Sequence, residues 1–341
     1  MNLRELSALL NLSATTVSRA LNGYPEVNAD TRDRVLAAAR RHGYAPNQGA
    51  RRLATGRANA IGHVVPLGAH QMINPVFAEF ISGAGETYSA AGFDLILSIV
   101  PEAEEANAYR AMAAQRKVDG IIVNAPRLLD TRIDLLNALG LPFLMHGRDS
   151  RPEGDYAWID INNRRAFLRA TDLLLGLGHR RVALVNGFET LYFAQRRRAG
   201  YLAALSARGI AADPALMRDA DMTEPYGYGA VMEMMRLREP PTAFLASSML
   251  VAFGALRAVR ELGLRLGRDI SIVAHDDDLS HLPNSGPVPL FTATRSSVRA
   301  AGRRAAEMLI ARIAEPDSPP RNELWEVELT LGQSTGPRQQ E

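Results

Sequence analysis

Apolar positions recur at helical spacing through the first 43 residues, and short polar turns separate the apolar segments. Leucines repeat over 3–10, and Asn2 with Glu5 three residues later has the form of a capping box. The same pattern predicts a second, short helix over 13–22 and a third helix over 29–42. Helix, tight turn, helix and supporting helix is the order of a helix-turn-helix unit, whose second helix enters the major groove of DNA.

The second predicted helix has one apolar and one polar face. Val17 and Leu21 lie four residues apart and can anchor it to the helix behind. The opposite face carries small or polar side chains and one long cation: Ala14, Thr15, Ser18, Arg19 and Asn22. Taken alone, this segment fits an ordinary amphipathic surface helix equally well, and only the flanking helices favour a DNA-reading role.

From residue 58 onward, short apolar runs alternate with helical patterns. Strands are predicted over 61–65, 93–99, 120–123, 142–145, 158–161, 181–185, 242–246 and 270–274. Helices are predicted over 75–91, 104–115, 132–139, 163–177, 194–208, 227–237, 250–262 and 298–313. This alternation predicts an α/β core of doubly wound parallel sheets, and two lobes fit it better than one barrel. Binding sites should then lie at the carboxyl ends of strands that face the cleft.

Composition narrows the class of protein. A chain of 341 residues is too long for one small domain and suits a headpiece with a larger body. No run of about 18 apolar residues occurs, so no membrane span is expected, and the N-terminus lacks the apolar core of a signal peptide. The chain has no cysteine, which excludes disulfides and thiolate metal sites and fits a cytoplasmic protein.

Charge is unevenly distributed although the net charge is only +2. The first 57 residues contain nine arginines against two glutamates and two aspartates, so the remainder is mildly acidic. The basic end continues into a segment over 46–57 whose one large apolar side chain is Leu53. A basic headpiece on an acidic body indicates a polyanionic partner for the first 57 residues only.

Four motifs in this end of the chain resemble the headpiece and hinge helix of the LacI family of transcription regulators: Thr16–Asn22, Val27–Arg32, Gly43–Asn47 and Ala50–Leu53. The resemblance implies contacts with double-stranded operator DNA from Ala14, Thr15, Thr16, Ser18, Arg19, Asn22, Asn47, Arg51 and Leu53. In the family the first two of these set base choice, and the leucine is a wedge between base pairs in the minor groove. The hinge segment is too short to be a stable helix alone, so we expect it to fold only on DNA.

The body resembles the two-lobed effector-binding core of the same family, which is related to periplasmic sugar-binding proteins. The resemblance implies a helix-turn-helix headpiece over 1–46, a hinge over 47–57 and an effector-binding, dimerising core over 58–331. The remaining polar tail, 332–341, has no leucine heptads that could build a tetramer helix. In the family the chain crosses between the lobes three times, and we place these crossings near residues 160, 290 and 325.

The resemblance also implies effector contacts. Arg197 lies in an Arg-x-x-Gly-aromatic signature and would bind the effector through its planar fork of donors. Asp276 would hold a ligand hydroxyl, and Phe77 either stacks on the effector or is simply part of the core. Further candidates at strand ends or on the loop before the signature are Arg148, Asp160, Tyr192 and Phe193.

Two sequence features qualify that picture. Ser248-Met249 stands where most family members carry an acidic pair, so the sugar specificity of any one member cannot simply be carried over. The aspartates at 276–278, with His275 and His281 beside them, resemble a metal site. Neighbouring strand residues point in alternating directions, however, which disfavours a metal role. No cofactor is expected.

These observations predict a ligand-responsive repressor that binds a near-palindromic operator as a homodimer and responds to a small molecule, most naturally a sugar. The body looks most like bacterial regulators of alpha-glucoside utilisation. A transport protein would need a signal peptide and no headpiece. An enzyme of sugar metabolism would need a catalytic constellation, but the chain has no Gly-rich phosphate loop, His-Glu-x-x-His pair or Gly-x-Ser-x-Gly elbow.

Overall fold

The computed structural model describes residues 1–21, 23–44, 56–67, 74–151 and 156–339. Most of the expected hinge over 47–57 lies outside these ranges, as do four residues with an expected DNA contact: Asn22, Asn47, Arg51 and Leu53. The chain divides into two compact units, a headpiece (Met1–Asn59) and a core (Ala60–Glu341).

Three helices are described in the headpiece: α1 (Leu3–Leu10), α2 (Ala14–Leu21) and α3 (Ala29–Arg41). The capping box is present, because the Asn2 side chain accepts from the backbone of Glu5 and the Glu5 side chain accepts from the backbone of Asn2. Side chains from all three helices, including Leu6, Val17 and Val35, form a small buried core. That shared core holds the short helix α2 in place, since a helix of this length is marginal by itself.

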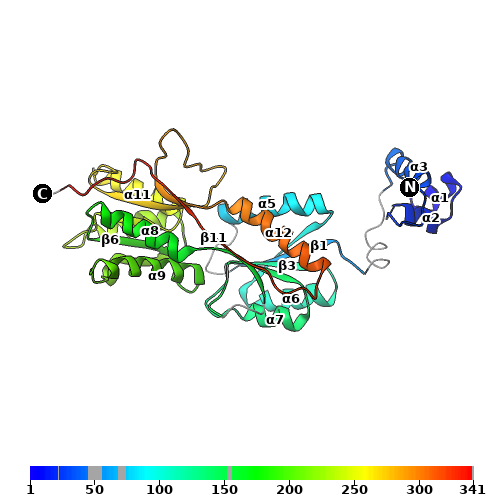
Figure 1. Cartoon of the computed structure of the whole chain (residues 1–341), viewed down its shortest axis with the longest axis horizontal. Coiled ribbons are helices and arrows are strands. Elements are labelled where there is room, and N and C mark those ends of the chain that lie inside the picture. Colours follow the sequence, from blue (N-terminus) through cyan, green and yellow to red (C-terminus); the bar gives the residue numbers. More distant parts are fainter. Residues whose placement is uncertain (22, 45–55, 68–73, 152–155, 340–341) are drawn as a thin grey trace. The chain divides into compact units, whose positions relative to one another are not determined.

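The core contains two six-stranded sheets, each at the centre of one lobe (Figure 1). In lobe 1 the strand order is β11-β5-β4-β3-β1-β2, and each of these pairings is parallel. Its strands are β1 (Ala60–Leu67), β2 (Asp94–Pro101), β3 (Gly120–Asn124), β4 (Phe143–His146), β5 (Ala157–Ile161) and β11 (Asn322–Trp325). Its helices are α5 (Pro75–Ala91), the short η1 (Glu102–Glu104), α6 (Glu105–Ala114), α7 (Thr131–Leu139) and α12 (Val298–Ala314).

Lobe 2 has the strand order β12-β10-β9-β8-β6-β7, and only its β10–β12 pairing is antiparallel. Its strands are β6 (Val182–Gly187), β7 (Met217–Ala220), β8 (Ala243–Ala246), β9 (Ser271–Asp276), β10 (Thr292–Arg295) and β12 (Glu328–Thr330). Its helices are α8 (Asn163–Gly176), α9 (Tyr192–Ala207), η2 (Pro214–Leu216), α10 (Glu224–Met234) and α11 (Met249–Glu261).

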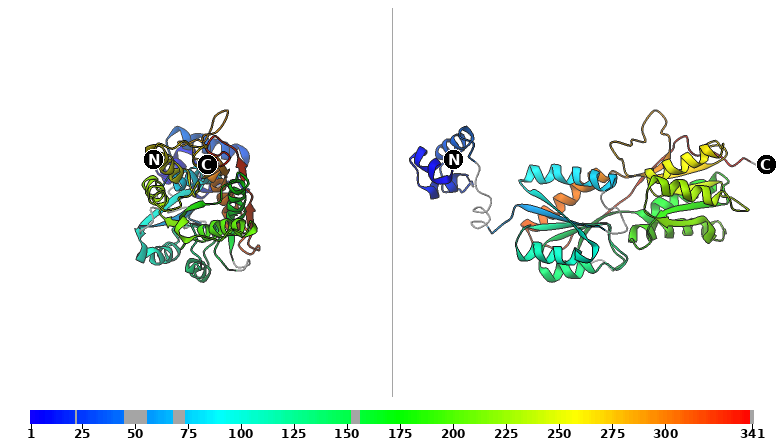
Figure 2. Two further views of the ribbon diagram at one scale, coloured as in Figure 1. Left: turned by 90° about the vertical axis from the view of Figure 1, so that its left-hand side faces the viewer. Right: turned by 180° about the vertical axis from the view of Figure 1, so that it is seen from behind.

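Helices cover both faces of each sheet. In lobe 1, α5 and α12 pack together on one face and α6 and α7 lie on the other (Figure 2). In lobe 2, α8 pairs with α9 on one face and α10 pairs with α11 on the opposite face (Figure 1). The predicted doubly wound α/β architecture is therefore confirmed, and nearly continuous apolar strands such as β6 are buried on both faces because helices cover them.

The chain crosses between the lobes three times, but the second crossing differs from the prediction. It follows β10, at about residues 296–297, and not residue 290, because β10 still belongs to the lobe 2 sheet. The sequence pattern missed this strand, and it missed β7, β11 and β12. Strands of three or four residues with charged or polar members leave no clear period-2 signal.

The C-terminal residues as far as Arg338 are attached to lobe 2. Ser334 is fully buried, accepts from the backbone of Thr292 and donates to the carbonyl oxygen of Ile272 at 2.5 Å. The backbone of Gly336 donates to the Ser271 hydroxyl at 3.2 Å. The polar composition of this segment therefore reflects hydrogen bonds to the last strands of the sheet.

Candidate ligand-binding site

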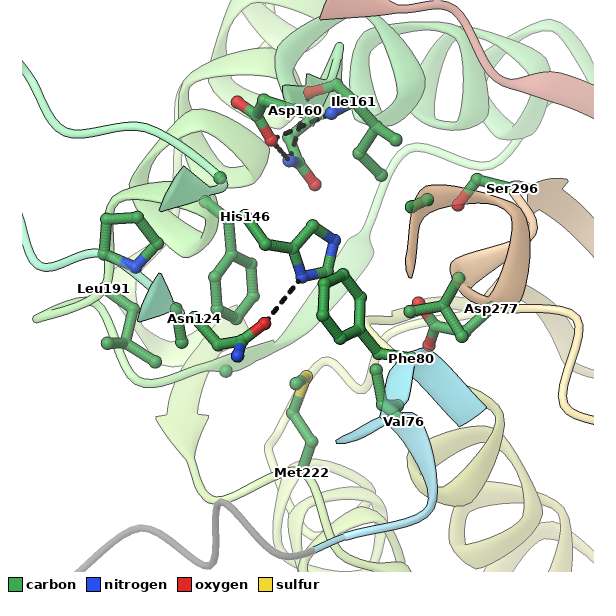
Figure 3. Close-up of a pocket in the computed structure, with 18 of the residues that line it drawn as sticks. Val76, Phe80, Asn124, His146, Asp160, Ile161, Leu191, Met222, Asp277 and Ser296 are labelled. Carbon is green, nitrogen blue, oxygen red and sulfur yellow. Dashed lines mark hydrogen bonds between the residues drawn. The ribbon is translucent and has the colours of Figure 1, made fainter. Parts of the chain in front are cut away.

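A cavity of about 210 Å³ lies between the two lobes (Figure 3), and we call it the main chamber. Its walls come largely from the carboxyl ends of parallel strands, where doubly wound folds place their ligands. Strand ends contribute Asn124, His146, Arg148, Asp160, Gly187, Ser247, Asp277 and Ser296. Five expected effector contacts line the main chamber: Phe77, Arg148, Asp160, Phe193 and Arg197.

Arg197 is held in the wall by contacts along its edge and on its flat faces. Its Nε donates to Asn163 Oδ1 at 2.8 Å, and its Nη1 donates to the Ser247 carbonyl oxygen at 2.6 Å. The rings of Phe167 and Phe193 lie 5.1 and 4.9 Å from the guanidinium carbon. The side chain is almost fully buried, so its planar fork is preorganised before any ligand arrives.

The signature around Arg197 has a packing reason. A Cβ at Gly200 would lie 2.1 Å from the backbone oxygen of Arg164, so only glycine lets α9 approach α8 this closely. One residue later, the Tyr201 hydroxyl donates to the carbonyl oxygen of Val182 at 2.8 Å and ties α9 to the sheet. Glycine and aromatic residue together fix the helix that carries the arginine.

Two aspartates and a second arginine set the electrostatics of the main chamber. Burial lowers the pKa of Arg197 to about 10, although Asp277 and Asp160 oppose that shift. Burial raises the pKa of Asp160 to about 6, although Arg148, whose Nε donates to it at 3.2 Å, opposes the shift. The Arg148 guanidinium also lies 5.0 Å from the centre of the Trp158 ring. Buried charges of both signs therefore face one another across the wall.

A stacked pair of aromatic side chains from lobe 1 also lines the chamber. The rings of Phe80 and His146 stack with their centres 4.3 Å apart, and His146 Nδ1 lies 3.1 Å from Asn124 Oδ1 (Figure 3). Burial lowers the pKa of His146 to about 4, which keeps the ring neutral near pH 7. None of these three residues was among the effector contacts expected from the sequence. Asn124 and His146 end β3 and β4, which is the signal that identified Asp160.

Lobe 2 supplies the carboxylates of Asp221 and Asp277 to the main chamber, and the expected Asp276 is not among the lining residues. Asp276 is turned into its own loop, where it accepts from the backbone of Asp278 at 2.8 Å. Successive residues at a strand end point in opposite directions, so only one of Asp276 and Asp277 can face the cavity. The buried His275, whose pKa is lowered by burial and then by Arg197, lies 3.5 Å from Asp277.

Tyr192 also differs from the expectation, because Phe193 lines the main chamber and Tyr192 does not. Successive helix residues point about 100° apart, so the two rings at the start of α9 cannot face the same space. The Tyr192 ring instead lies 5.9 Å from the guanidinium carbon of Arg196. Ser248, which the sequence places where an acidic residue is usual, caps α11. Its hydroxyl accepts from the backbone of Val251 at 3.2 Å.

Direct hydrogen bonds join the two lobes at two places. At one place, the Leu128 backbone donates to the Thr190 carbonyl oxygen at 3.3 Å, and the Tyr192 backbone donates to the Pro126 carbonyl oxygen at 3.0 Å. At the other place, the Ser280 hydroxyl donates to the Glu79 carboxylate at 2.8 Å. A ligand in the main chamber therefore touches two lobes that already contact each other.

The chamber combines apolar rings with hydrogen-bond donors and acceptors, as a small polar ligand with apolar faces requires. Within the described ranges, no group of three His, Asp or Glu side chains could hold a metal ion. None of the helices described is long and apolar enough to cross a membrane.

The headpiece presents a different surface. On α2, Ala14, Thr15 and Arg19 are exposed, whereas Val17 is buried in the headpiece core. The backbone of Thr16 donates to the Ser13 hydroxyl at 3.0 Å, which caps the helix as predicted. The exposed face of α2 is therefore the polar face that the sequence pattern identified.

Comparison with known proteins assigns the two units. Residues 2–47 match the family of bacterial regulatory proteins called lacI, and residues 171–335 match the periplasmic binding protein-like domain. The transcriptional regulator AglR of Rhizobium meliloti is 47% identical over 99% of this chain and 95% of its own length. RafR of Escherichia coli is 37% identical over 93% of this chain and 94% of its own length.

Solved structures agree with this assignment. The lac repressor dimer bound to operator and the anti-inducer ONPF has a TM-score of 0.83 and 26% identity, and the match covers 98% of this chain and 99% of that one. The CelR–cellobiose complex has a TM-score of 0.72 and 28% identity, with the same coverage of both chains. These relatives are transcription regulators, so the protein is a regulator and not an enzyme. The chain belongs to the lacI family of bacterial regulatory proteins.

Proposed function

We propose that the protein represses a sugar-utilisation operon and that a sugar bound in the main chamber controls its binding to operator DNA. The observation that carries the proposal is the wall around Arg197, where a preorganised fork of donors lies beside aromatic rings and buried carboxylates. Hydroxyl groups suit such donors and acceptors, and the apolar face of a sugar ring suits the rings. The resemblance of the whole body favours an alpha-glucoside as the sugar.

The DNA contacts of the proposal come from the headpiece. Ala14 and Thr15 would read base edges, Thr16 and Ser18 would contact the backbone, and Arg19 suits the edge of a guanine. Asn22, Asn47, Arg51 and Leu53 complete the set on the strength of the sequence resemblance. In this proposal residues 1–46 read the operator, 47–57 form the hinge and 58–331 bind effector and partner.

The proposal includes a homodimer on a near-palindromic operator, working in the cytoplasm. The lac repressor structure to which this chain is similar is a dimer bound to operator. On the edge strand β2, Leu95, Leu97 and Ile99 are 38–46% exposed and point to one side of the sheet. An exposed apolar row of this kind supports burial against a second copy of the chain.

Selection of bound duplexes from a random pool, followed by gel shift with a sugar panel, tests the proposal. We expect the full-length protein to retain near-palindromic DNA and at least one of maltose, trehalose, sucrose or glucose to change the amount bound. The same sugar should stabilise the protein by about 2.7 kcal/mol at a hundredfold excess over its Kd. The proposal fails if no specific duplex is retained, or if no sugar changes either measurement.

A further inference from the structure

A second chamber of about 160 Å³ adjoins the main chamber, and we call it the side chamber. Val76 and Met222, which Figure 3 labels, line both chambers. The two chambers share lining residues from both lobes: Asn74, Val76, Asp221, Met222 and Asp277. Because five residues line both chambers, the two spaces lie side by side. A ligand too long for the main chamber would extend past Val76 and Met222 into the side chamber.

Hydroxyl donors in the side chamber come from two helix caps. Thr223 Oγ1 accepts from the backbone of Tyr226 at 3.3 Å, and Ser248 Oγ accepts from the backbone of Val251 at 3.2 Å. In each case the oxygen serves the helix, and no described residue accepts the hydroxyl hydrogen. Both hydrogens can therefore be donated to a ligand oxygen.

Acceptors in the side chamber come from a carboxylate that the protein leaves unused. The side-chain carboxylate of Asp221 has no hydrogen-bond or salt-bridge partner among the described residues, although its backbone carbonyl accepts from the backbone of Thr223 at 2.8 Å. The Glu224 carboxylate, by contrast, is held by Arg257 at 2.7 and 3.1 Å. Asp277 adds a second carboxylate at the border. Donors beside acceptors suit sugar hydroxyls, which do both, and the two carboxylates disfavour a phosphate group.

We propose that the side chamber is a subsite for a second sugar ring, so that the protein selects a disaccharide over its constituent monosaccharides. This inference rests on the proposed function, in which the main chamber binds a sugar. Neither chamber alone reaches the roughly 300 Å³ at which pockets for larger small molecules begin, whereas the two together do. None of the described residues that line the side chamber is aromatic, so it selects by hydrogen bonds and shape.

Calorimetric titration of the full-length protein with maltose and with glucose tests the subsite. Maltose should bind the parent protein about tenfold or more tightly than glucose, because only maltose reaches the second set of polar groups. Leu250→Trp, at a half-buried position that lines the side chamber alone, should fill it. The variant should lose the maltose preference and keep the glucose affinity of the parent.

The matched control is a substitution of Leu262, the residue that follows α11. Leu262 is 40% exposed and remote from both chambers, so Leu262→Trp should change neither affinity. If Leu250→Trp does not fold, Leu250→Phe should show a smaller loss of the maltose preference. Equal binding of glucose and every disaccharide tried, or an unchanged maltose preference in Leu250→Trp, overturns the subsite alone. Failure of every sugar to bind the parent overturns the proposed function itself.

Discussion

The exposed face of α2 and the wall of the main chamber are built in opposite ways. On α2 the expected DNA contacts are small or exposed side chains on a helix of eight residues, anchored by one buried valine and its neighbours. In the main chamber Arg197 and Asp160 are buried and already hydrogen-bonded to their surroundings. One surface is free to meet a large partner, and the other is a closed network that a small ligand must join.

Because of this difference, the two surfaces should respond differently to substitution. An exposed side chain acts nearly alone, so its removal should cost the free energy of its own contact and be sensitive to salt. A side chain in a buried network holds other charges and hydrogen bonds in place, and its removal leaves those groups unpaired. Effects in the main chamber should therefore be larger and less local than effects on α2.

Arg197→Ala should give the largest effect. It removes the hydrogen bonds to Asn163 and Ser247. It also takes one positive charge away from the buried carboxylates of Asp160 and Asp277, of which Asp160 keeps Arg148 as its partner. Loss of one partner in such a buried, hydrogen-bonded set costs about 2–5 kcal/mol of binding free energy. We expect sugar binding to be lost in calorimetry while operator binding in a gel shift stays close to that of the parent.

Arg198 provides the control for this variant. It is the next residue on α9 and is exposed, and it pairs with Glu189 at 3.1 Å. Surface pairs of this kind contribute about 0–1 kcal/mol, so Arg198→Ala should keep both sugar and operator binding. Undiminished sugar binding in Arg197→Ala would remove the arginine from the effector site.

The residues of α2 could be predicted from the sequence more completely than the residues that line the main chamber. Spacing and polarity identified α2, its cap and its buried residue, because all of these depend on neighbours a few positions away. The main chamber depends on which strand ends meet across two lobes. Five of seven expected contacts line it, whereas Asp276 and Tyr192 do not. One step along a strand reverses the direction of a side chain, and one step along a helix turns it by about 100°.

Some residues of the site could not be identified from the sequence pattern around them. Trp325 lines the main chamber from β11, a four-residue strand that returns to lobe 1 from far along the chain. Asn163 follows the first lobe crossing and meets Arg197 only because Gly200 allows two helices to approach closely. Contacts of this kind follow from packing between distant segments, and a periodic pattern within one segment cannot contain them.

The buried carboxyl of Asp160 should make the stability of the protein depend on pH. Burial raises the pKa of this carboxyl from 3.8 to about 6, so between these values the folded protein binds a proton that the unfolded chain has released. The contribution of this carboxyl to the free energy of unfolding is therefore fully present below about pH 4, and it is lost as the pH rises through 6. Two pKa units correspond to about 3 kcal/mol, and Asp160→Asn should remove that slope from the free energy of unfolding.

Urea unfolding at several pH values between 4 and 7 provides the measurement. The parent minus Asp160→Asn difference isolates this carboxyl, because other acidic groups contribute equally to both proteins. Asp317 is exposed and serves as the control, since Asp317→Asn should reproduce the pH dependence of the parent. A parent and an Asp160→Asn variant with parallel curves would show that the carboxyl keeps an ordinary pKa in the folded core.

Arg19→Ala should give the smallest and most local effect. Arg19 is exposed on α2, so its loss leaves the fold of the headpiece intact and removes one contact with a base edge. We expect a cost of about 1–3 kcal/mol on the selected operator, relaxed discrimination at one base pair, and unchanged sugar binding. Arg40→Ala, an equal loss of charge at an exposed position of α3, should weaken specific and random DNA together. If Arg19→Ala kept the parent's ratio of operator to random binding, Arg19 would act through charge alone, and base reading would belong to Ala14 and Thr15.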